Sequence, residues 1–413
     1  MEPGISARAN RQLDKQGLFA YYTEHHLRKR ECFHPLDNPD GYIGLCIAEN
    51  LLVSDLLLPK MAESRNVPAR SLAYDDWVGS PHFRATVAEF MSDSFLGRSI
   101  DPAHLYTLAG ASAVVEAFFF AVADPGDSVL IPTPSYAGFW ADIEGRDEVK
   151  IVPVHASSDD SFILHTANLD AAFDSAPTPV RALIFTSPDN PLGRVYRPEQ
   201  IEEVISWCEK RGIHLLVDEV YALSVFGETP FTSVASVRQS LGDHIHLVWA
   251  FSKDFAVSGL RCGVIYTENE ELGRSLSVQA MWSSVSGDTQ HLLATMVSDR
   301  EWVDLYLGEM RDTLARAQRR TVAALDAIGV PYIESGAGFF VLCDFRAFLE
   351  EQTWEAEHHL WTTFLEKTGV NLTPGSACRI GEPGFMRLCF AAEETDTVVT
   401  GIEKLGGVLS GVG

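Results

Sequence analysis

The stretch HIHLVWAFSKDFAVSGLRCG, residues 244–263, joins a near-continuous apolar run to a lysine and then to an arginine. Its first part, residues 244–252, predicts a strand buried on both faces, as in a parallel sheet. Lys253 would then stand at the carboxyl end of that strand, where ligands bind in open α/β sheets. A lysine in this place is either solvated on a loop, or buried with a lowered pKa that lets it react with a carbonyl compound.

Three further segments have the same apolar pattern: residues 127–132 (DSVLIP), 180–188 (VRALIFTSP) and 213–221 (IHLLVDEVY). Between the last two, a helix is predicted to begin at Pro198 and to end before Gly212. Strands that alternate with helices predict βαβ units and a parallel sheet. We therefore expect an α/β fold, with a ligand site at the carboxyl edge of the sheet.

The segments before and after these strands predict further helices, further strands and the domain limits. A helix is expected to open at Ser80 and Pro81, and residues 306–320 predict a long helix. The segments GAGFFVLCDF (336–345) and GFMRLCFA (384–391) predict strands. We expect an N-terminal arm and part of a small domain in residues 1–70, a large cofactor-binding domain in residues 71–300, and a C-terminal small domain in residues 301–413.

The composition of the chain disfavours several classes of binding partner and site. The 413 residues include 32 Lys and Arg and 57 Asp and Glu, so the net charge of −25 disfavours nucleic acids and anionic membrane surfaces as partners. No apolar run is long enough to span a bilayer, and no secretory signal pattern is present. Seven dispersed cysteines without a Cys-x-x-Cys pair favour reduced thiols, a cytoplasmic protein and no metal site.

Four residues could bind a phosphate. A helical run begins at Ala111 and Ser112, where free backbone N–H groups and the helix dipole favour an anion. Ser252 and Arg261 flank the lysine, and an arginine can bind a phosphate with two parallel hydrogen bonds. Taken alone, Ser112 is better explained as an ordinary helix cap.

Four other residues could hold a flat ring. Asp218 ends a buried strand and needs a partner, such as a protonated ring nitrogen. Asn190 and Tyr221 could hydrogen-bond to a ring hydroxyl, and Tyr136 could stack on the ring. Alone, Tyr136 is explained by packing and Asn190 by a turn. With Lys253 taking an aldehyde, the set predicts a pocket for pyridoxal 5′-phosphate (PLP).

The segments SPDNPLG (187–193), VDEVY (217–221) and SKDFAVSGLRCG (252–263) resemble motifs of the class I aminotransferase family. This resemblance spans most of the chain. It implies the type I fold of PLP enzymes, which has a large domain with a mostly parallel seven-stranded sheet flanked by helices, and a smaller α+β domain. It also implies a homodimer whose active sites are shared across the interface.

Within that family the chain most resembles 1-aminocyclopropane-1-carboxylate (ACC) synthases, through GLCIAENLL (44–52) and LTPGSACRIGEPGFMRLCF (372–390). The likeness implies that Arg387 binds the substrate α-carboxylate and that Glu49 lies near the substrate side chain. Two positions depart from the pattern. Trp77 replaces a tyrosine that reaches the neighbouring subunit's cofactor and substrate, and Ala250 stands where a phosphate-binding serine is expected.

These assignments predict a PLP-dependent lyase or transferase. Lys253 would remove the Cα proton of an amino acid while Asp218 holds the ring nitrogen protonated and Tyr221 the ring hydroxyl. S-adenosylmethionine is the favoured substrate, because Glu49 and the acidic composition suit a cation. Loss of methylthioadenosine from Cγ would then either close a cyclopropane or join the aminobutyrate unit to a second substrate in a biosynthetic reaction. Trp77 favours the second outcome, because an indole N–H only donates and cannot act as an acid or base.

Two alternatives stay open at this point. The same core residues would serve an aminotransferase that exchanges an amino acid and a 2-oxo acid. A PLP-binding transcriptional regulator is a remote possibility, since no basic patch or helix-turn-helix pattern precedes the cofactor domain.

Overall fold

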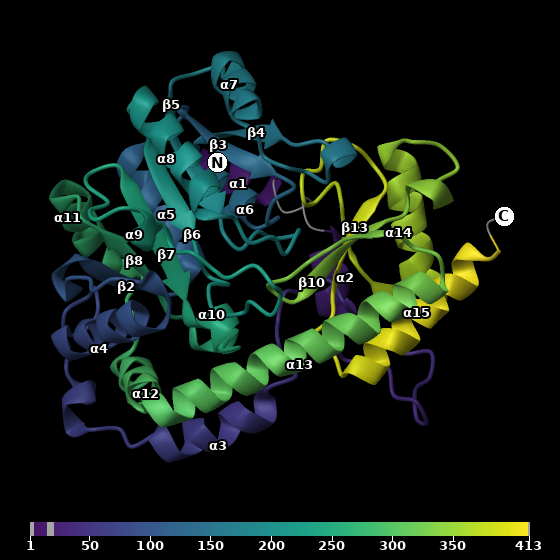
Figure 1. Cartoon of the computed structure of the whole chain (residues 1–413), viewed down its shortest axis with the longest axis horizontal. Coiled ribbons are helices and arrows are strands. Elements are labelled where there is room, and N and C mark those ends of the chain that lie inside the picture. The colour runs from purple at the N-terminus through teal and green to yellow at the C-terminus, as the bar shows by residue number, and fades with distance from the viewer. Residues whose placement is uncertain (1–3, 15–19, 412–413) are drawn as a thin grey trace.

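The computed structural model describes residues 4–14 and 20–411. The positions 1–3, 15–19 and 412–413 of the predicted arm and C-terminal domain lie outside the described residues. A seven-stranded sheet forms the centre of the larger part of the molecule (Figure 1). Across the sheet the strands follow the order β2 (Leu105–Leu108), β8 (Gly263–Thr267), β7 (Ile245–Ala250), β6 (His214–Asp218), β5 (Val180–Thr186), β3 (Ser128–Thr133) and β4 (Lys150–His155).

Strand β8 is the one member of this sheet that runs antiparallel to its neighbours, so the sheet is mostly parallel as predicted. Its strands are apolar because helices cover both faces. Alternate residues of β6 show this, since Leu216 packs in one apolar cluster and Leu215 in the other. One face is covered by α5 (Ala111–Val122), α6 (Phe139–Glu144) and α11 (Glu270–Gln279). The other is covered by α4 (Pro81–Met91), α7 (Thr166–Ser175) and α8 (Pro198–Arg211).

The predicted helix boundaries have local causes. Helix α4 begins after Ser80, whose hydroxyl accepts a hydrogen bond from the Phe83 N–H, and Pro81 occupies the first helical position. Helix α8 begins at Pro198 and ends at Gly212, which adopts the left-handed conformation typical of a helix end.

The smaller part contains a second, antiparallel sheet of four strands: β12 (Thr373–Pro374), β13 (Phe385–Cys389), β10 (Phe340–Asp344) and β9 (Tyr332–Ile333). Strand β1 (Ile43–Gly44) pairs in parallel with β11 (Val370–Asn371), so an N-terminal segment lies with the C-terminal part. The long helix α13 (Arg300–Ala327) runs from α12 (Gly287–Ser298) along the molecule to α15 (Thr395–Leu409) (Figure 1). The domain limits at residues 70 and 300 stay a prediction.

The remaining described elements are short or peripheral. The helices are α1 (Ala7–Asp14), α2 (Ala20–Arg28), α3 (Ser54–Ser64), α9 (Val234–Val237), α10 (Phe251–Asp254) and α14 (Trp354–Thr368). Single turns of 3₁₀ helix are η2 (Ala69–Leu72), η4 (Pro102–His104), η5 (Ser158–Asp160), η6 (Ser258–Leu260), η7 (Ala280–Trp282) and η8 (Arg346–Phe348), and a π-helical turn is η3 (Ser92–Leu96). Among the helices so described, none is both long and apolar enough to cross a bilayer.

Candidate active site

One cavity of about 330 Å³ lies at the carboxyl ends of the parallel strands. Its lining brings together nine of the residues predicted for the cofactor and one predicted for the substrate: Ala111, Ser112, Tyr136, Asn190, Asp218, Tyr221, Ser252, Lys253, Arg261 and Glu49. Segments far apart in the sequence therefore converge on one space, because the carboxyl ends of parallel strands share one edge of the sheet.

Lys253 stands in α10, directly after β7 ends at Ala250. Its Nζ donates a hydrogen bond to the Ala48 carbonyl at 2.7 Å. Desolvation lowers the pKa of Lys253 to about 8, and the positive charge of Arg387 acts in the same direction, whereas the Glu49 carboxylate opposes it. A substantial neutral fraction of this amine is therefore available near pH 8, as a nucleophilic lysine requires.

Asp218 is the last residue of β6 and is buried, with 6% of its surface exposed. The Val220 N–H donates to its Oδ1 at 3.2 Å. Burial raises the pKa of Asp218 to about 7. No arginine or lysine forms a salt bridge with it in the part of the chain that is described. The carboxyl group is therefore free to pair with a cationic N–H from a ligand.

A hydrogen-bonded chain links the cavity to the small domain. The Asn190 amide donates to the Tyr221 hydroxyl at 3.3 Å, and its Oδ1 accepts from Arg387 Nη1 at 3.1 Å. Arg387 lies in β13 and also donates through Nη2 to the Thr373 hydroxyl at 3.0 Å. Its Nε is buried and finds no partner among the described residues. A buried donor without a partner is unfavourable, so this guanidinium suits an anionic ligand.

The end of the cavity near α5 fits an anion. The helix begins at Ala111 directly after Gly110, which has a φ of +94° and lies against Arg261. A Cβ at Gly110 would stand 2.4 Å from Arg261 Nη2, so the close approach of the guanidinium to the helix start requires glycine. The Ser112 hydroxyl hydrogen-bonds to Asp142, whose pKa burial raises to about 7. A helix N-terminus beside an arginine is a typical phosphate site.

The residues present fit PLP. The helix start with Arg261 suits the phosphate, and the buried carboxyl of Asp218 suits the pyridine nitrogen. The amine of Lys253 faces the same cavity and suits the aldehyde.

Of the predicted substrate residues, Glu49 alone lines the cavity. Arg387 does not line it, but donates a hydrogen bond to the lining residue Asn190. Trp77 lies elsewhere, 39% exposed, with its ring 5.4 Å from that of Tyr74. It lines a second hollow of about 240 Å³ together with residues such as Ser286 and Gln290. Within one chain, Trp77 therefore does not reach the Lys253 cavity.

Two lining residues with ionisable side chains were missed by the sequence analysis. Tyr22 reaches the cavity from α2, and Asp142 reaches it from α6. Asp142 stands in the first turn of the helix that follows Tyr136. Its position six residues after Tyr136 could have predicted that it lies near the same cavity. Tyr22 carries no such signal, because nothing in its local sequence shows where the arm crosses the molecule.

Comparison with known proteins agrees with this geometry. The model of the family "Aminotransferase class I and II" matches residues 40–405. The chain is 34% identical to 1-aminocyclopropane-1-carboxylate synthase 6 of Arabidopsis thaliana over 391 residues, which cover 90% of this chain and 79% of that protein. It is 33% identical to 1-aminocyclopropane-1-carboxylate synthase of Malus domestica over 396 residues, covering 90% and 84% of the two chains.

Solved structures show the same fold. Aspartate aminotransferase from Thermus thermophilus with maleate superposes with a TM-score of 0.80 at 21% identity, covering 98% of this chain and 100% of that one. Aromatic aminotransferase from Pyrococcus horikoshii OT3 gives 0.78 at 22% identity, with coverage of 95% and 99%. The predicted type I fold is thereby confirmed. The chain belongs to the class I and II aminotransferase family, whose members are PLP-dependent enzymes.

Proposed function

We propose that this enzyme acts on an α-amino acid with a cationic side chain, S-adenosylmethionine being the favoured substrate. The observation that carries the proposal is Glu49, which lines the same cavity as Lys253. Within residues 4–14 and 20–411, its carboxylate forms no hydrogen bond or salt bridge, and its charge acts on Lys253 across the cavity. A carboxylate partly removed from water attracts a cation, and a sulfonium next to the reacting carbons would supply one. The similar relatives named ACC synthases support this choice.

When bound, PLP supplies an aldehyde for the substrate amine and a ring that withdraws electrons from Cα. Arg387 holds the α-carboxylate and so sets the direction of the Cα–H bond, and Lys253 Nζ takes the Cα proton. Asp218 would keep a proton on the ring nitrogen, while Asn190 and Tyr221, which hydrogen-bond to each other, would hold the ring hydroxyl.

The phosphate would be held by the first N–H groups of α5 at Ala111 and Ser112, by the Ser252 hydroxyl and by Arg261, all of which line the cavity. Tyr136, which also lines the cavity, would pack against the face of the ring. Ala250 lines the cavity without a hydroxyl, so one phosphate hydrogen bond of the family pattern needs a donor from elsewhere.

Loss of the Cα proton can lead to two products from S-adenosylmethionine. If the Cα electron pair attacks Cγ, the C–S bond breaks, methylthioadenosine leaves and a cyclopropane closes. If a second proton is lost from Cβ, the C–S bond breaks, methylthioadenosine leaves and a Cβ=Cγ double bond forms. A nucleophile can then add at Cγ while protons return to Cβ and Cα, which joins the aminobutyrate unit to a second substrate. Trp77 favours the second route, because it cannot replace a tyrosine in proton transfer or in a phenolate role.

We further propose a cytoplasmic homodimer. Apolar side chains stand exposed around the Trp77 hollow, with Tyr74 90%, Leu72 86% and Trp282 75% accessible. Large exposed apolar patches mark interaction sites, and a second copy would cover this one and let Trp77 approach the partner's cavity. All seven cysteines are free, which is typical of proteins in a reducing compartment.

The proposal is tested by incubating the holoenzyme with S-adenosylmethionine and identifying the products by mass spectrometry. We expect methylthioadenosine in stoichiometric or catalytic amounts. Glu49→Gln should raise KM for S-adenosylmethionine about tenfold or more, as expected for a lost charge–charge contact. Glu49→Asp should retain part of the affinity, and the KM or Kd for neutral L-methionine should not change in either variant.

Two results would contradict the proposal. Absence of both methylthioadenosine and any change in the cofactor absorbance would exclude S-adenosylmethionine as a substrate. Formation of pyridoxamine phosphate with common amino acids, and of 2-oxo acids from them, would assign the enzyme to transamination instead.

A further inference from the structure

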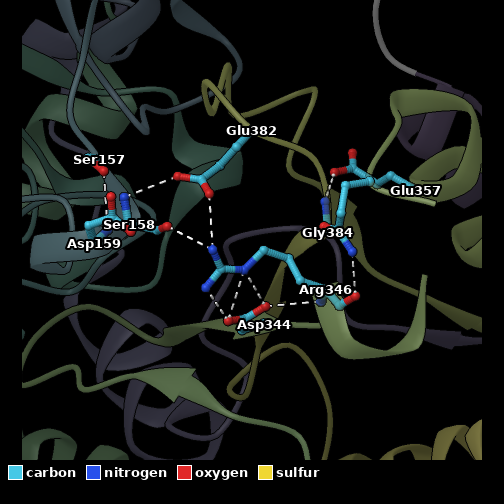
Figure 2. Close-up of polar contacts among 9 residues, drawn as sticks. Ser157, Ser158, Asp159, Asp344, Arg346, Glu357, Glu382 and Gly384 are labelled. Carbon is cyan, nitrogen blue, oxygen red and sulfur yellow. Dashed lines mark hydrogen bonds and ion pairs between the residues drawn. The ribbon is translucent and has the colours of Figure 1, made fainter. Parts of the chain in front are cut away.

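The loop of residues 375–384 connects β12 to β13 and joins the two parts of the molecule. The Cys378 carbonyl accepts a hydrogen bond from the Ser135 N–H at 2.9 Å. Glu382 Oε1 accepts one from the Ser158 N–H at 3.1 Å (Figure 2). Ser135 directly precedes Tyr136 of the cavity, so the loop touches the large domain beside the site. We call residues 375–384 the bridging loop.

Arg346 is the centre of the contact between this loop and the large domain. Its Nη1 donates both to the Ser158 hydroxyl at 2.9 Å and to Glu382 Oε2 at 3.0 Å (Figure 2). Its Nε and Nη2 form a two-pronged contact with Asp344, at 3.0 and 2.7 Å. Asp344 is the last residue of strand β10, and Ser158 is the first residue of η5. The guanidinium therefore binds the small-domain sheet and the large domain at the same time. Bidentate pairs of this kind fix geometry as well as adding energy.

A third carboxylate, from helix α14, binds both ends of the bridging loop. Glu357 of α14, with only 1% of its surface exposed, accepts hydrogen bonds from the Ser376 N–H at 2.9 Å and the Gly384 N–H at 2.8 Å. Gly384 has a φ of +101°, and a Cβ there would lie 2.5 Å from Cγ of Arg346. The end of the loop is therefore packed directly on the Arg346 side chain.

The bridging loop leads straight into β13, which carries Arg387. Arg387 is also tied to Thr373 at the other end of the loop. A shift of the loop therefore moves Arg387 relative to Lys253, which belongs to the large domain. We infer that Arg346, with Glu382 and Ser158, forms an interdomain clasp that positions Arg387 for the substrate α-carboxylate. Arg346 is a positioning residue in this inference, which rests on the carboxylate role proposed for Arg387.

The test compares ligands that differ by the carboxylate. Binding to the holoenzyme is followed through the cofactor absorbance, with S-adenosylmethionine and its decarboxylated form as one pair and L-alanine and ethylamine as the other. In Arg346→Gln we expect the Kd of the carboxylate-bearing member to rise about tenfold, because small displacements of a positioning group weaken binding on this scale. The Kd of the amine should stay within about twofold of its original value.

Three further variants separate positioning from loss of stability. Ser158→Ala removes one hydrogen bond of the clasp from the large-domain side. It should change the ratio of the Kd of the carboxylate-bearing ligand to the Kd of the amine by a smaller factor than Arg346→Gln does. Arg346→Lys should recover part of the wild-type ratio, since it keeps the charge but not the fork. Arg320→Gln breaks an ion pair with Asp396 that lies outside the clasp, and should leave the ratio unchanged.

Hydrogen exchange of the apoenzyme gives a readout that is independent of activity. Amides of residues 376–384 should exchange faster in Arg346→Gln and not in Arg320→Gln. The inference fails if Arg346→Gln and Ser158→Ala keep the wild-type ratio of Kd values. A wild-type enzyme that binds both members of each pair equally would instead contradict the role of Arg387. Failure of S-adenosylmethionine alone to bind would contradict only the substrate proposal, and the alanine pair would then decide on the clasp.

Discussion

Lys253 and Asp218 face one cavity, and the same physical cause shifts their pKa values in opposite directions. Removal from water disfavours the charged form of each, so the pKa of Lys253 falls to about 8 and that of Asp218 rises to about 7. Both groups are therefore close to their titration points in the physiological range. Such values are typical of active-site groups that must change protonation state during a reaction.

The pKa of Lys253 predicts how the apoenzyme takes up PLP. The neutral amine is the reacting form, so the rate of PLP incorporation should rise with pH and level off above about pH 8. Glu49 raises the pKa of Lys253, so Glu49→Gln should move the midpoint to lower pH. The measurement is the growth of the absorbance of lysine-attached cofactor at a series of pH values.

Lys253→Ala serves as the control and should give none of that absorbance. A midpoint near 10.5, the ordinary lysine value, would show that the side chain is solvated, and the cofactor assignment of Lys253 would then be wrong.

The start of α5 shows how one element of the fold becomes a binding group. Strand β2 ends at Leu108, and the helix begins at Ala111 after a turn that contains Gly110. Because β8 runs antiparallel to β2, Arg261 just before β8 arrives beside this turn. A helix N-terminus and an arginine thereby meet through sheet order, although 150 residues separate them in sequence: 261 − 111 = 150.

A matched pair of glycines tests this arrangement. Gly110 and Gly126 both have a φ of +94°, but a Cβ meets Arg261 Nη2 at 2.4 Å in the first and nothing within 4 Å in the second. Both alanine variants should lose stability through backbone strain, by about 1–3 kcal/mol. Gly110→Ala should also weaken PLP binding, by roughly tenfold or more, because Arg261 must move.

Thermal unfolding of the apoenzymes and PLP titration separate the two effects. Equal loss of PLP affinity in Gly126→Ala would mean that strain alone accounts for the result, and the phosphate site would have to be placed elsewhere.

At the scale of the whole molecule, the sequence predicted the features that have a local pattern, namely the strands, the helices and the polar residues at strand ends. Apolar runs identified strands such as β5 and β6, and polar residues at their ends identified the cavity, because a parallel sheet brings those ends together. The long helix was predicted at 306–320 but extends over Arg300–Ala327, since the Asp299 side chain caps its start and its buried face continues to Leu325. The place of Tyr22, and the contacts of Arg346 with Ser158, depend on packing between distant segments and leave no local pattern.

The proposed dimer gives a prediction at this scale. Sedimentation should show a particle of about twice the chain mass of 45.5 kDa. Trp282→Asp places a charge in the exposed apolar face and should yield monomers with little activity. Leu36→Asp changes a side chain that is 86% exposed in a loop elsewhere and should leave mass and activity unchanged. A fully active monomer would contradict the shared site.

The pairing of β1 with β11 has a consequence for the order in which the chain folds during translation. Ile43 lies opposite Val370, so the closed loop spans 370 − 43 = 327 residues. Closing a loop of that length costs about 5 kcal/mol of chain entropy, which must be offset by contacts formed later. During synthesis this strand pair cannot form until Val370 has left the ribosome, whereas the central sheet is complete by Thr267. We therefore expect the seven-stranded sheet, with the cofactor residues 111–261, to fold first, and Arg387 to join the site only after the C-terminal strands emerge.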